Sequence, residues 1–465
     1  MENDILTTCV MYYSLFRKKL IYNETKLIKS FPKNVFGVFT TIRRYTKIKS
    51  HPIDIHGCIG HWDNNFNSLS EKDIYNNLLR VSHDAVWTDS RSKYFSPIET
   101  DPYSILELDF MLNPIYKINK TTGMIEKLNL QFSNITFGII IETADKSQRA
   151  TYLPNVFPNI SWNKLVESIK NKANITSQEF NLYAYKIVQI KSSYITLLTG
   201  EIFNYISIYK FTRFLLDNMK PRLVFPFAHT YKNNTLKWSS DDDVRNISTL
   251  SELYRYMNIY SGIASKSEQE NVKQKIVYIV ANIDRYNSQS LSFLGYIFPL
   301  LKINSTRFCQ KLLHDLPSAD EEFAKPEMII GLNHAGCITN IKDASLTFDQ
   351  NDSIFKMNWV IQAIISFDKK PAHRLVVMLE GKVDELINSK HHTETNYIAV
   401  AFEACCFVYK SNPVRKTEIL LKMFQLFFEL ERRRTDNNAL HTFLDKSARV
   451  DISGHINNGF AKLAL

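Results

Sequence analysis

Apolar and polar positions in the first 200 residues alternate between a strand period and a helical period. Short runs rich in β-branched and aromatic residues predict strands, and longer runs with apolar residues three and four apart predict helices. The strands are expected at 35–42, 106–112 and 137–142, and the helices at 71–83 and, after Ser161 as N-cap, at 162–172. This mixture predicts an α+β domain with a mixed sheet over residues 1–200.

Beyond residue 205 the pattern becomes helical almost without interruption. Helices are expected at 249–265, 268–286, 290–303, 353–367, 395–410 and 414–433. Several of them are apolar on more than one face, which indicates burial between neighbouring helices. Residues 201–465 are therefore predicted to form an all-helical domain of stacked hairpins, either a solenoid or a closed α/α toroid.

Length and composition support this division. The chain has 465 residues, of which 45% are hydrophobic and 22% charged, as in ordinary globular proteins. Because this length exceeds the usual size of a single core, two domains are expected. No apolar run is long enough to cross a bilayer, and the acidic first residues do not resemble a secretory signal. The six cysteines are scattered rather than arranged as a disulfide framework, so we expect a reduced, cytoplasmic protein.

The net charge of +10 adds little to the functional picture. Basic residues are distributed over both halves of the chain, and clusters such as Arg17-Lys18-Lys19 and Arg432-Arg433-Arg434 are short. A nucleic-acid-binding protein usually concentrates its basic residues on one face. We therefore expect neither a nucleic-acid partner nor membrane attachment.

Three short motifs carry the candidate chemistry of the first domain. They are His56-Gly57-Cys58-Ile59-Gly60, Asp89-Ser90-Arg91, and Arg149 followed by Leu153-Pro154. Gly57 and Gly60 around Cys58 favour a tight turn in which backbone and thiol are both accessible. Three polar motifs spread over about a hundred residues are typical of a cleft assembled from several loops.

These motifs, in this order, resemble the AMMECR-type domain family, which is named after the Alport-syndrome chromosomal region. The resemblance covers residues 5–195 and includes Phe95, Pro97, Val156 and Trp162. It implies the fold and the cleft of that family. The chain departs from the family pattern at His56, where arginine is usual, and at Ser92-Lys93-Tyr94, which lengthen one motif. A histidine would hold an anionic ligand only when protonated, so the ligand preference is open.

Cys58 is the centre of the predicted site, and its role has three interpretations. It is a structural or ligand-orienting thiol, a nucleophile whose pKa a nearby cation lowers, or a metal ligand. As a metal site, Cys58 with His56, His61 and His83 would provide donors suited to zinc, but their spacing matches no zinc signature. We predict no metal and no particular cofactor, and we expect His56 and Cys58 to share one face if this segment is a strand.

The remaining residues of the first site also have two interpretations each. Asp89 either forms an ion pair with Arg91 that braces a loop, or it orients a histidine or serves as a general base beside Cys58. Arg149 either binds a carboxylate or phosphate, or packs beneath its own turn. The predicted catalytic residues are therefore Cys58, His56 and Asp89, and the predicted substrate-binding residues are Arg91, Arg149 and His61.

In the helical half, no segment matches a catalytic motif cleanly. The helix count weakly resembles the six-hairpin toroids of glycosidase-like proteins, which implies acidic residues at the mouth of the ring. The candidates are Asp242, Asp451 and His455, although Asp242 precedes a helix and is equally suited to capping it. The segment 331–337 reads as a glycine-bounded loop. We favour a binding or scaffold module over an active hydrolase.

Two functional hypotheses follow. In the first, the AMMECR-type domain is a small-molecule or modification enzyme component with a cysteine-centred, anion-binding cleft. The family resemblance implies Memo-like and radical-SAM proteins as partners. In the second, the whole chain is a non-catalytic adaptor whose helical domain binds a protein or glycan partner.

Overall fold

A computed structural model shows two compact units, Met1–Leu197 and Leu198–Leu465, and each is described by itself. The structure describes residues 2–19, 31–45, 53–98, 101, 103–157, 160–220, 224–230, 235–238, 242–260, 262–338, 340, 346, 348–389, 394–411, 415–434 and 448–464. In this part of the chain, no helix is long and apolar enough to cross a membrane.

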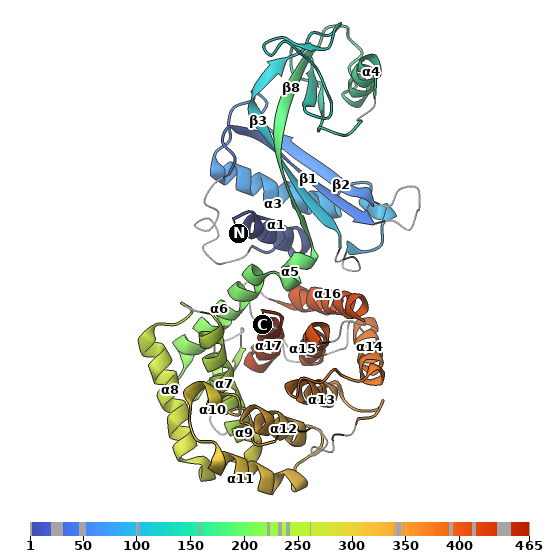
Figure 1. Ribbon diagram of the computed structural model, residues 1–465. Coiled ribbons are helices and arrows are strands. Elements are labelled where there is room, and N and C mark those ends of the chain that lie inside the picture. Colours follow the sequence, from blue (N-terminus) through green and yellow to red (C-terminus); the bar gives the residue numbers. More distant parts are fainter. Residues whose placement is uncertain are drawn as a thin grey trace. The chain divides into compact units, whose positions relative to one another are not determined.

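The first unit is built on a six-stranded sheet. In spatial order its strands are β2 (Ile53–Trp62), β1 (Val35–Tyr45), β3 (Ile105–Lys117), β8 (Asn181–Ser193), β6 (Gly138–Glu142) and β7 (Arg149–Tyr152). Every neighbouring pair is antiparallel. A two-stranded ribbon of β4 (Met124–Ile125) and β5 (Leu130–Gln131) accompanies it. The long strands β3 and β8 run from one end of the unit to the other (Figure 1).

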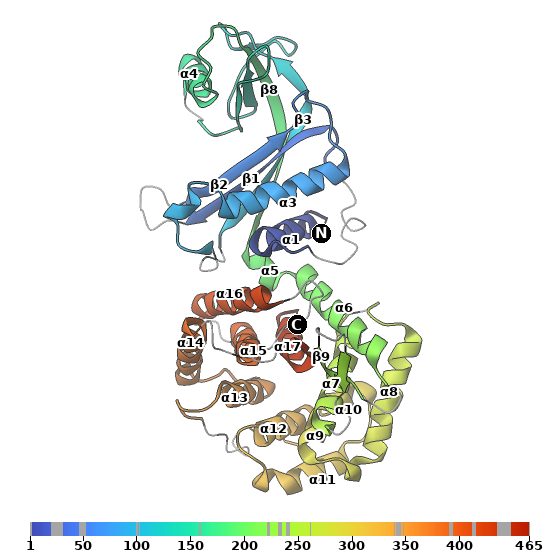
Figure 2. The same cartoon turned by 180° about the vertical axis from the view of Figure 1, so that it is seen from behind.

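Helices cover the sheet at both of its ends. Helix α1 (Glu2–Phe16) packs on α3 (Glu71–Trp87), which lies against β1 and β2, whereas α4 (Trp162–Lys172) lies near β7 (Figures 1 and 2). Helix α3 begins at the N-cap Ser70, whose hydroxyl accepts a hydrogen bond from the backbone N–H of Asp73. Its buried residues, among them Leu78 and Ala85, recur at helical spacing and face the sheet.

A β-bulge in β2 decides which residues face α3. The register with β1 shifts between Ile42, opposite Gly57, and Arg43, opposite Ile55, so His56 has no partner across the ladder. A Cβ atom on Gly57 would lie 1.9 Å from the carbonyl oxygen of Ala85 in α3. Glycine at 57 is therefore required by the close approach of a helix to the strand, and the predicted tight turn around Cys58 is wrong.

The second unit is almost entirely helical. Its helices, preceded by the short α5 (Ile195–Thr199), are α6 (Glu201–Asn218), α7 (Asp243–Ile259), α8 (Lys266–Ala281), α9 (Ser288–Ser292), α10 (Ile297–Leu301), α11 (Thr306–Asp315), α12 (Ala324–His334), α13 (Ile354–Ser366), α14 (His373–Asn388), α15 (Thr395–Ser411), α16 (Lys416–Arg433) and α17 (Val450–Ala464). A small sheet joins β9 (Pro226–Thr230) to β10 (Thr235–Trp238) and β11 (Ala448–Arg449).

The helices of the second unit pack in two layers. Helices α7, α9, α12, α13, α15 and α17 contact one another in sequence order, and α17 also contacts α7, so their packing closes on itself. Helices α8, α11, α14 and α16 lie outside this inner set (Figures 1 and 2). Each inner helix is thus buried between neighbours, which explains why α13 and α15 are apolar on most of their surface. The resemblance to six-hairpin toroid proteins stays a prediction.

The predicted fold class, an α+β part followed by a helical part, is confirmed, and several details differ. The six-stranded sheet is antiparallel rather than mixed. The helix predicted at 290–303 is divided into α9 and α10, with Pro299 inside the second piece. The segment 331–337, expected to be a loop, begins as the last turn of α12. For the helix predicted at 414–433, the predicted first residue, 414, lies outside the described residues.

The close approach at Gly57 leads to the first prediction. Gly57→Ala should destabilise the first unit by about 3 kcal/mol, because the added methyl meets a backbone carbonyl that cannot move aside cheaply. Cys9, buried in α1, reports on this unit alone, so its labelling by a thiol reagent across a urea series measures the change. Asn76→Ala, at an exposed position of α3 in the same unit, is the control and should have little effect. Equal urea midpoints for the Gly57 variant and the wild type would contradict the prediction.

Candidate functional site

The bulge in β2 separates the two residues that the sequence suggested as partners. His56 and Gly57 both face α3, and Cys58, the next residue, points to the other side of the sheet. The His56 ring shares a hydrogen bond of 2.9 Å between Nε2 and the carbonyl oxygen of Val86, and it lies 5.1 Å from the ring of Phe95. Burial lowers the pKa of His56. The expectation that His56 and Cys58 share one face is therefore wrong.

Asp89 holds the backbone of Cys58 in place. The backbone N–H of Cys58 donates to Asp89 Oδ2 at 2.9 Å, and the Nε and Nη2 atoms of Arg91 donate to the same carboxylate at 2.9 and 2.6 Å. Burial acts to raise the pKa of Asp89, but these hydrogen bonds outweigh it and lower the pKa to about 2. Asp89 is thus an ionised brace, which is the ion-pair interpretation of the motif.

The thiol of Cys58 lies in a half-buried position among hydrogen-bonding and charged groups. The hydroxyl of Thr41, directly opposite on β1, donates to Sγ at 3.2 Å. Arg91 Nη2 donates to the carbonyl oxygen of Cys58 at 3.3 Å. Burial raises the pKa of Cys58, while Thr41 and the positive charges of Arg91 and Lys172 oppose that rise. The net effect is a thiol that is protonated at neutral pH.

Lys172 completes this group, and the sequence did not point to it. It is the last residue of α4, and its Nζ donates to the carbonyl oxygen of Thr151 at 2.9 Å while lying 4.6 Å from the ring centre of Tyr152. Burial lowers the pKa of Lys172, and the nearby Cys58 opposes this. A lysine in the last turn of a helix is the common pattern for the helix dipole, so nothing local distinguished this one.

Asp109 adds a second unusual carboxyl on the same sheet. It lies on β3 and accepts a hydrogen bond of 2.6 Å from Gln189 Nε2. Burial raises the pKa of Asp109 to about 6; the Gln189 hydrogen bond opposes this and the charge of Glu107 adds to it. Glu107 itself is paired with Arg43 at 2.8 Å and Lys191 at 2.7 Å. Asp109 is therefore the carboxyl in this group that titrates closest to neutral pH.

The predicted substrate-binding residues lie at two places. Arg91 is beside Cys58, as described, whereas Arg149 on β7 stacks over the indole of Trp62, 4.5 Å from the ring centre. Trp62 in turn stacks on Phe39. Burial lowers the pKa of Arg149. Burial also lowers the pKa of His61, with the charges of Arg80 and Arg149 contributing. Both side chains thus belong to the Trp62 end of β2.

In the second unit the three predicted residues have separate surroundings. Asp242 is the N-cap of α7, where it accepts from the backbone N–H of Arg245 and pairs with its guanidinium, so the capping interpretation describes it. Asp451 lies in α17, and its side chain is outside the described residues. His455, also in α17, forms a hydrogen bond of 2.7 Å through Nδ1 with Glu403 of α15.

Sequence reasoning missed Glu403 as well as Glu252 and Glu327. All three are on inner helices, and Glu403 is 1% exposed inside the apolar run of α15. A single acid in such a run is itself the signal, because carboxylates are almost never fully buried unless paired. The described residues contain no group of three or more His, Cys, Asp or Glu side chains that could hold a metal ion. Cys309 and Cys337 form a disulfide, which the sequence did not suggest.

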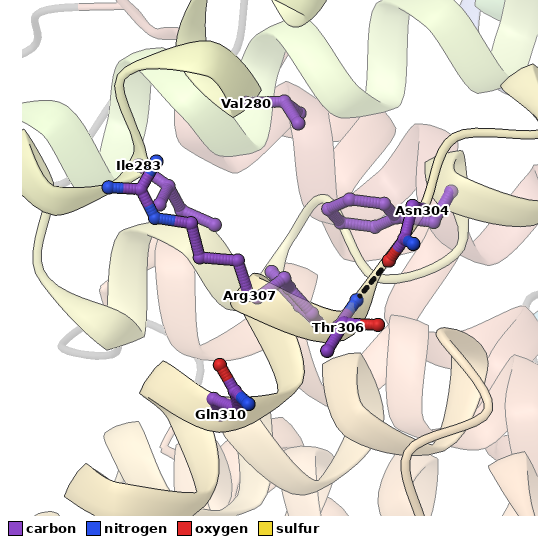
Figure 3. Close-up of a pocket in the computed structure, with 8 residues that line it drawn as sticks. Val280, Ile283, Asn304, Thr306, Arg307 and Gln310 are labelled. Atoms are coloured by element: carbon purple, nitrogen blue, oxygen red, sulfur yellow. Dashed lines mark hydrogen bonds between the residues drawn. The ribbon is translucent and has the colours of Figure 1, made fainter.

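A hollow on the surface of the second unit has a different character. It has a volume of about 540 Å³ and lies between α8, α10 and α11 (Figure 3). Its walls include Val280, Ile283 and Phe298, and its polar groups serve local structure: Asn304 Oδ1 accepts from the backbone N–H of Thr306 at 2.8 Å. With Arg307 as its titratable residue, paired with Asp284, this hollow offers no acid–base pair.

Comparison with known proteins identifies the first unit. Residues 9–193 match the family model AMMECR1. This match confirms the resemblance seen in the three motifs. No curated protein and no solved structure shows a significant match to the chain.

The raised pKa of Asp109 leads to a prediction for stability against pH. An unfolded aspartate has a pKa near 3.9, so the folded state binds this proton more tightly. Binding of this proton stabilises the folded first unit fully below about pH 4, and the stabilisation is lost as the pH rises through about 6. Asp109→Asn, which cannot ionise and can still accept from Gln189, should therefore stabilise the first unit by roughly 2 kcal/mol at pH 8 and by little at pH 4.

Urea denaturation with Cys9 as the reporter measures this change, using a pyridyl disulfide that reacts with thiols at acidic pH. Asp84→Asn on the surface of α3 is the matched control and should have little effect at either pH. A stabilisation by Asp109→Asn that is the same at both pH values would show that ionisation of Asp109 is not its cause.

Proposed function

We propose, for a chain that carries an AMMECR1 domain over residues 9–193, that this domain binds a small anionic molecule beside Cys58. In this proposal the domain is a small-molecule or modification enzyme component, and the cleft is centred on the cysteine. The bound group is a carboxylate or a phosphate, because lysine and arginine are the side chains that proteins use for these anions.

The observation that carries the proposal is the meeting of two cations at one half-buried thiol. Arg91 comes from the segment after α3, and Lys172 comes from the end of α4, and both lower the pKa of Cys58. The Arg91 side chain is 42% exposed. Lys172 is an exposed residue whose Nζ is partly desolvated where it donates to the carbonyl oxygen of Thr151, so both side chains border solvent. Positive charge beside a polar S–H group is the arrangement that an anion requires.

Cys58 orients the ligand in this proposal. Its raised pKa keeps the thiol protonated at neutral pH, so that it is a weak hydrogen-bond donor to the anion. Asp89 is the positioning residue, because its carboxylate is occupied by the hydrogen bonds from Cys58 and Arg91. This proposal adopts the ligand-orienting interpretation of Cys58 and the ion-pair interpretation of Asp89, in place of the nucleophile, metal-ligand and general-base interpretations.

The second candidate function is a non-catalytic adaptor, in which the helical part binds a protein or glycan partner and the Cys58 site is vestigial. The raised pKa of Cys58 and the hydrogen bonds that already occupy the carboxylate of Asp89 favour an adaptor over a hydrolytic enzyme. The two candidates differ in one respect: only the first requires Lys172 to act on anions.

We also propose a cytoplasmic location with Memo-like or radical-SAM partners. Four free cysteines, at positions 9, 58, 405 and 406, support a reducing compartment, and the disulfide of Cys309 with Cys337 is the observation against it. Alkylating the thiols during cell lysis shows whether this disulfide is present in the native protein. Alkylation of Cys309 and Cys337 supports a cytoplasmic location, whereas an intact disulfide contradicts a reducing compartment.

Alkylation of Cys58 tests the anion site directly. Iodoacetate is an anion and iodoacetamide is its neutral analogue. The alkylation rate of one cysteine by iodoacetate, divided by its rate with iodoacetamide, therefore measures the local attraction for anions. The ratio should be about tenfold higher at Cys58 in the folded protein than in urea, and Lys172→Met should abolish most of this difference. Peptide mapping by mass spectrometry assigns the label to Cys58, because the other free thiols are buried.

Lys170→Met is the matched control, since this lysine of the same helix lies over the ring of Phe180. It should leave the ratio unchanged, and added salt should reduce the ratio in the wild type. The pH midpoint for alkylation of Cys58 should lie above that of a free thiol, as burial dictates. A ratio insensitive to Lys172→Met would favour the adaptor instead.

A further inference from the structure

Strand β2 forms one edge of the six-stranded sheet, and β1 is the strand that it pairs with (Figure 1). In such a strand every second residue directs both its N–H and its C=O away from the sheet. Cys58 is one of these residues, because its N–H donates to Asp89 Oδ2 at 2.9 Å and its C=O accepts from Arg91 Nη2 at 3.3 Å. By this alternation the backbone groups of Gly60 and Trp62 also face the free edge.

Side chains occupy the free edge on either side of Gly60. The segment after α3 does so at Cys58, and Arg149 Nη2 of β7 donates to the C=O of Trp62 at 3.5 Å. The N–H and C=O of Gly60 have no hydrogen-bond partner among the residues that the structure describes, and Gly60 is only partly buried. One donor and one acceptor of the same residue are therefore open to a ligand at this edge.

Glycine at position 60 leaves these two groups unshielded. A Cβ atom there would lie 2.2 Å from Cε1 of Phe39, so the ring of the paired residue accounts for the absence of a side chain. Glycine inside a strand is also common where another backbone approaches closely. Gly60 therefore suits pairing with a further strand.

Positive charge is present at both ends of this edge. The partly exposed Arg91 lies at the Cys58 end, as does Lys172, whose Nζ donates to the C=O of Thr151 at 2.9 Å. The pKa of Cys58 responds to the charges of both, which places them near the thiol. Arg149 lies at the opposite end. Charge complementarity therefore favours a ligand that carries a negative group at its Cys58 end.

An extended peptide backbone matches the open groups of Gly60. In an antiparallel pair, one residue exchanges both of its N–H···O bonds with the residue opposite, and recognition by an added strand uses the same pairing. Pairing cannot continue at Cys58, because Asp89 and Arg91 already hold the backbone groups there. A peptide that ends at this point would bring its terminal carboxylate to the Arg91 and Lys172 cations.

We propose that the anion of the Cys58 site is the C-terminal carboxylate of a peptide whose penultimate residue pairs with Gly60 as an added antiparallel strand. In this register the last residue of the peptide lies opposite Ile59, and its carboxylate reaches the level of Cys58. Free C-terminal ends of peptides or proteins are thus the ligand class. The inference rests on the proposed function, since it requires the anion site, and it adds the backbone pairing at Gly60.

The test is protection of Cys58 in the full-length protein from alkylation by iodoacetamide, which is neutral. Acetylated trialanine with a free carboxylate is the probe, because the proposal involves no side chain of the peptide. Its concentration for half protection should be about tenfold lower than that of its C-terminal amide or of acetate. Lys172→Met should remove most of the preference for the carboxylate over the amide, and Lys170→Met should retain it.

Methylation of single peptide nitrogens tests the pairing with Gly60. On the middle alanine, methylation removes the N–H that donates to the C=O of Gly60, and it should raise the concentration for half protection about tenfold. On the first alanine, whose N–H points away from β2, methylation is the matched control and should have little effect. Equal effects of the two methylations would overturn the strand pairing.

Two further outcomes would overturn the inference. If trialanine protects no better than acetate, while the preference of Cys58 for iodoacetate still depends on Lys172, the anion site stands and the peptide is excluded. If an acetylated tripeptide amide with aspartate in the middle protects as well as free trialanine, the site takes an acidic side chain rather than a chain end. A preference for iodoacetate that is insensitive to Lys172→Met would instead remove the proposed function, and this inference with it.

Discussion

The carboxylate of Asp89 is the constraint on which the site of the first unit depends. It is only 5% exposed, and it accepts from the backbone N–H groups of Cys58 and Arg91 and from two guanidinium nitrogens. A buried charge is tolerable only with such partners, so the loop after α3 has one place to lie against β2. That position sets the thiol of Cys58 and the cation of Arg91, and it requires glycine at 57 because the helix passes so close to the strand.

Much of the first unit follows from sequence patterns, and the exceptions have physical reasons. The strands β1, β3 and β6 and the helices α3 and α4 are recognisable because their apolar residues recur at two or nearly four positions. The same reasoning misread the glycines around Cys58 as a turn, because a glycine needed for close packing is indistinguishable locally from one needed for a turn. Lys172 was missed because only the tertiary packing of α4 brings it near Cys58.

In the second unit, local sequence signals pointed to acids other than those on the inner helices. Asp242 attracted attention as one of a run of aspartates, and such residues before a helix mostly cap it. Glu403, by contrast, stands alone in the apolar segment of α15. Desolvation makes an isolated acid in such a segment costly, so its presence there implies partners from elsewhere in the fold. A single acid in an apolar helix therefore indicates a buried polar interaction that the local sequence does not show.

The charges around Cys58 suit binding better than covalent chemistry. The hydrogen bond from Thr41 and the charges of Arg91 and Lys172 counter the effect of burial on the thiol, while Asp109 acts with burial to raise the pKa of Cys58. An anion held by Lys172 would neutralise the cation that favours the thiolate, so the pKa of Cys58 would rise further in the complex. Attack by sulfur would then need a base, and the predicted base, Asp89, is already occupied by its own hydrogen bonds. Binding of an anion thus weakens the activation of the thiol by these same cations, which favours the ligand-orienting interpretation of Cys58.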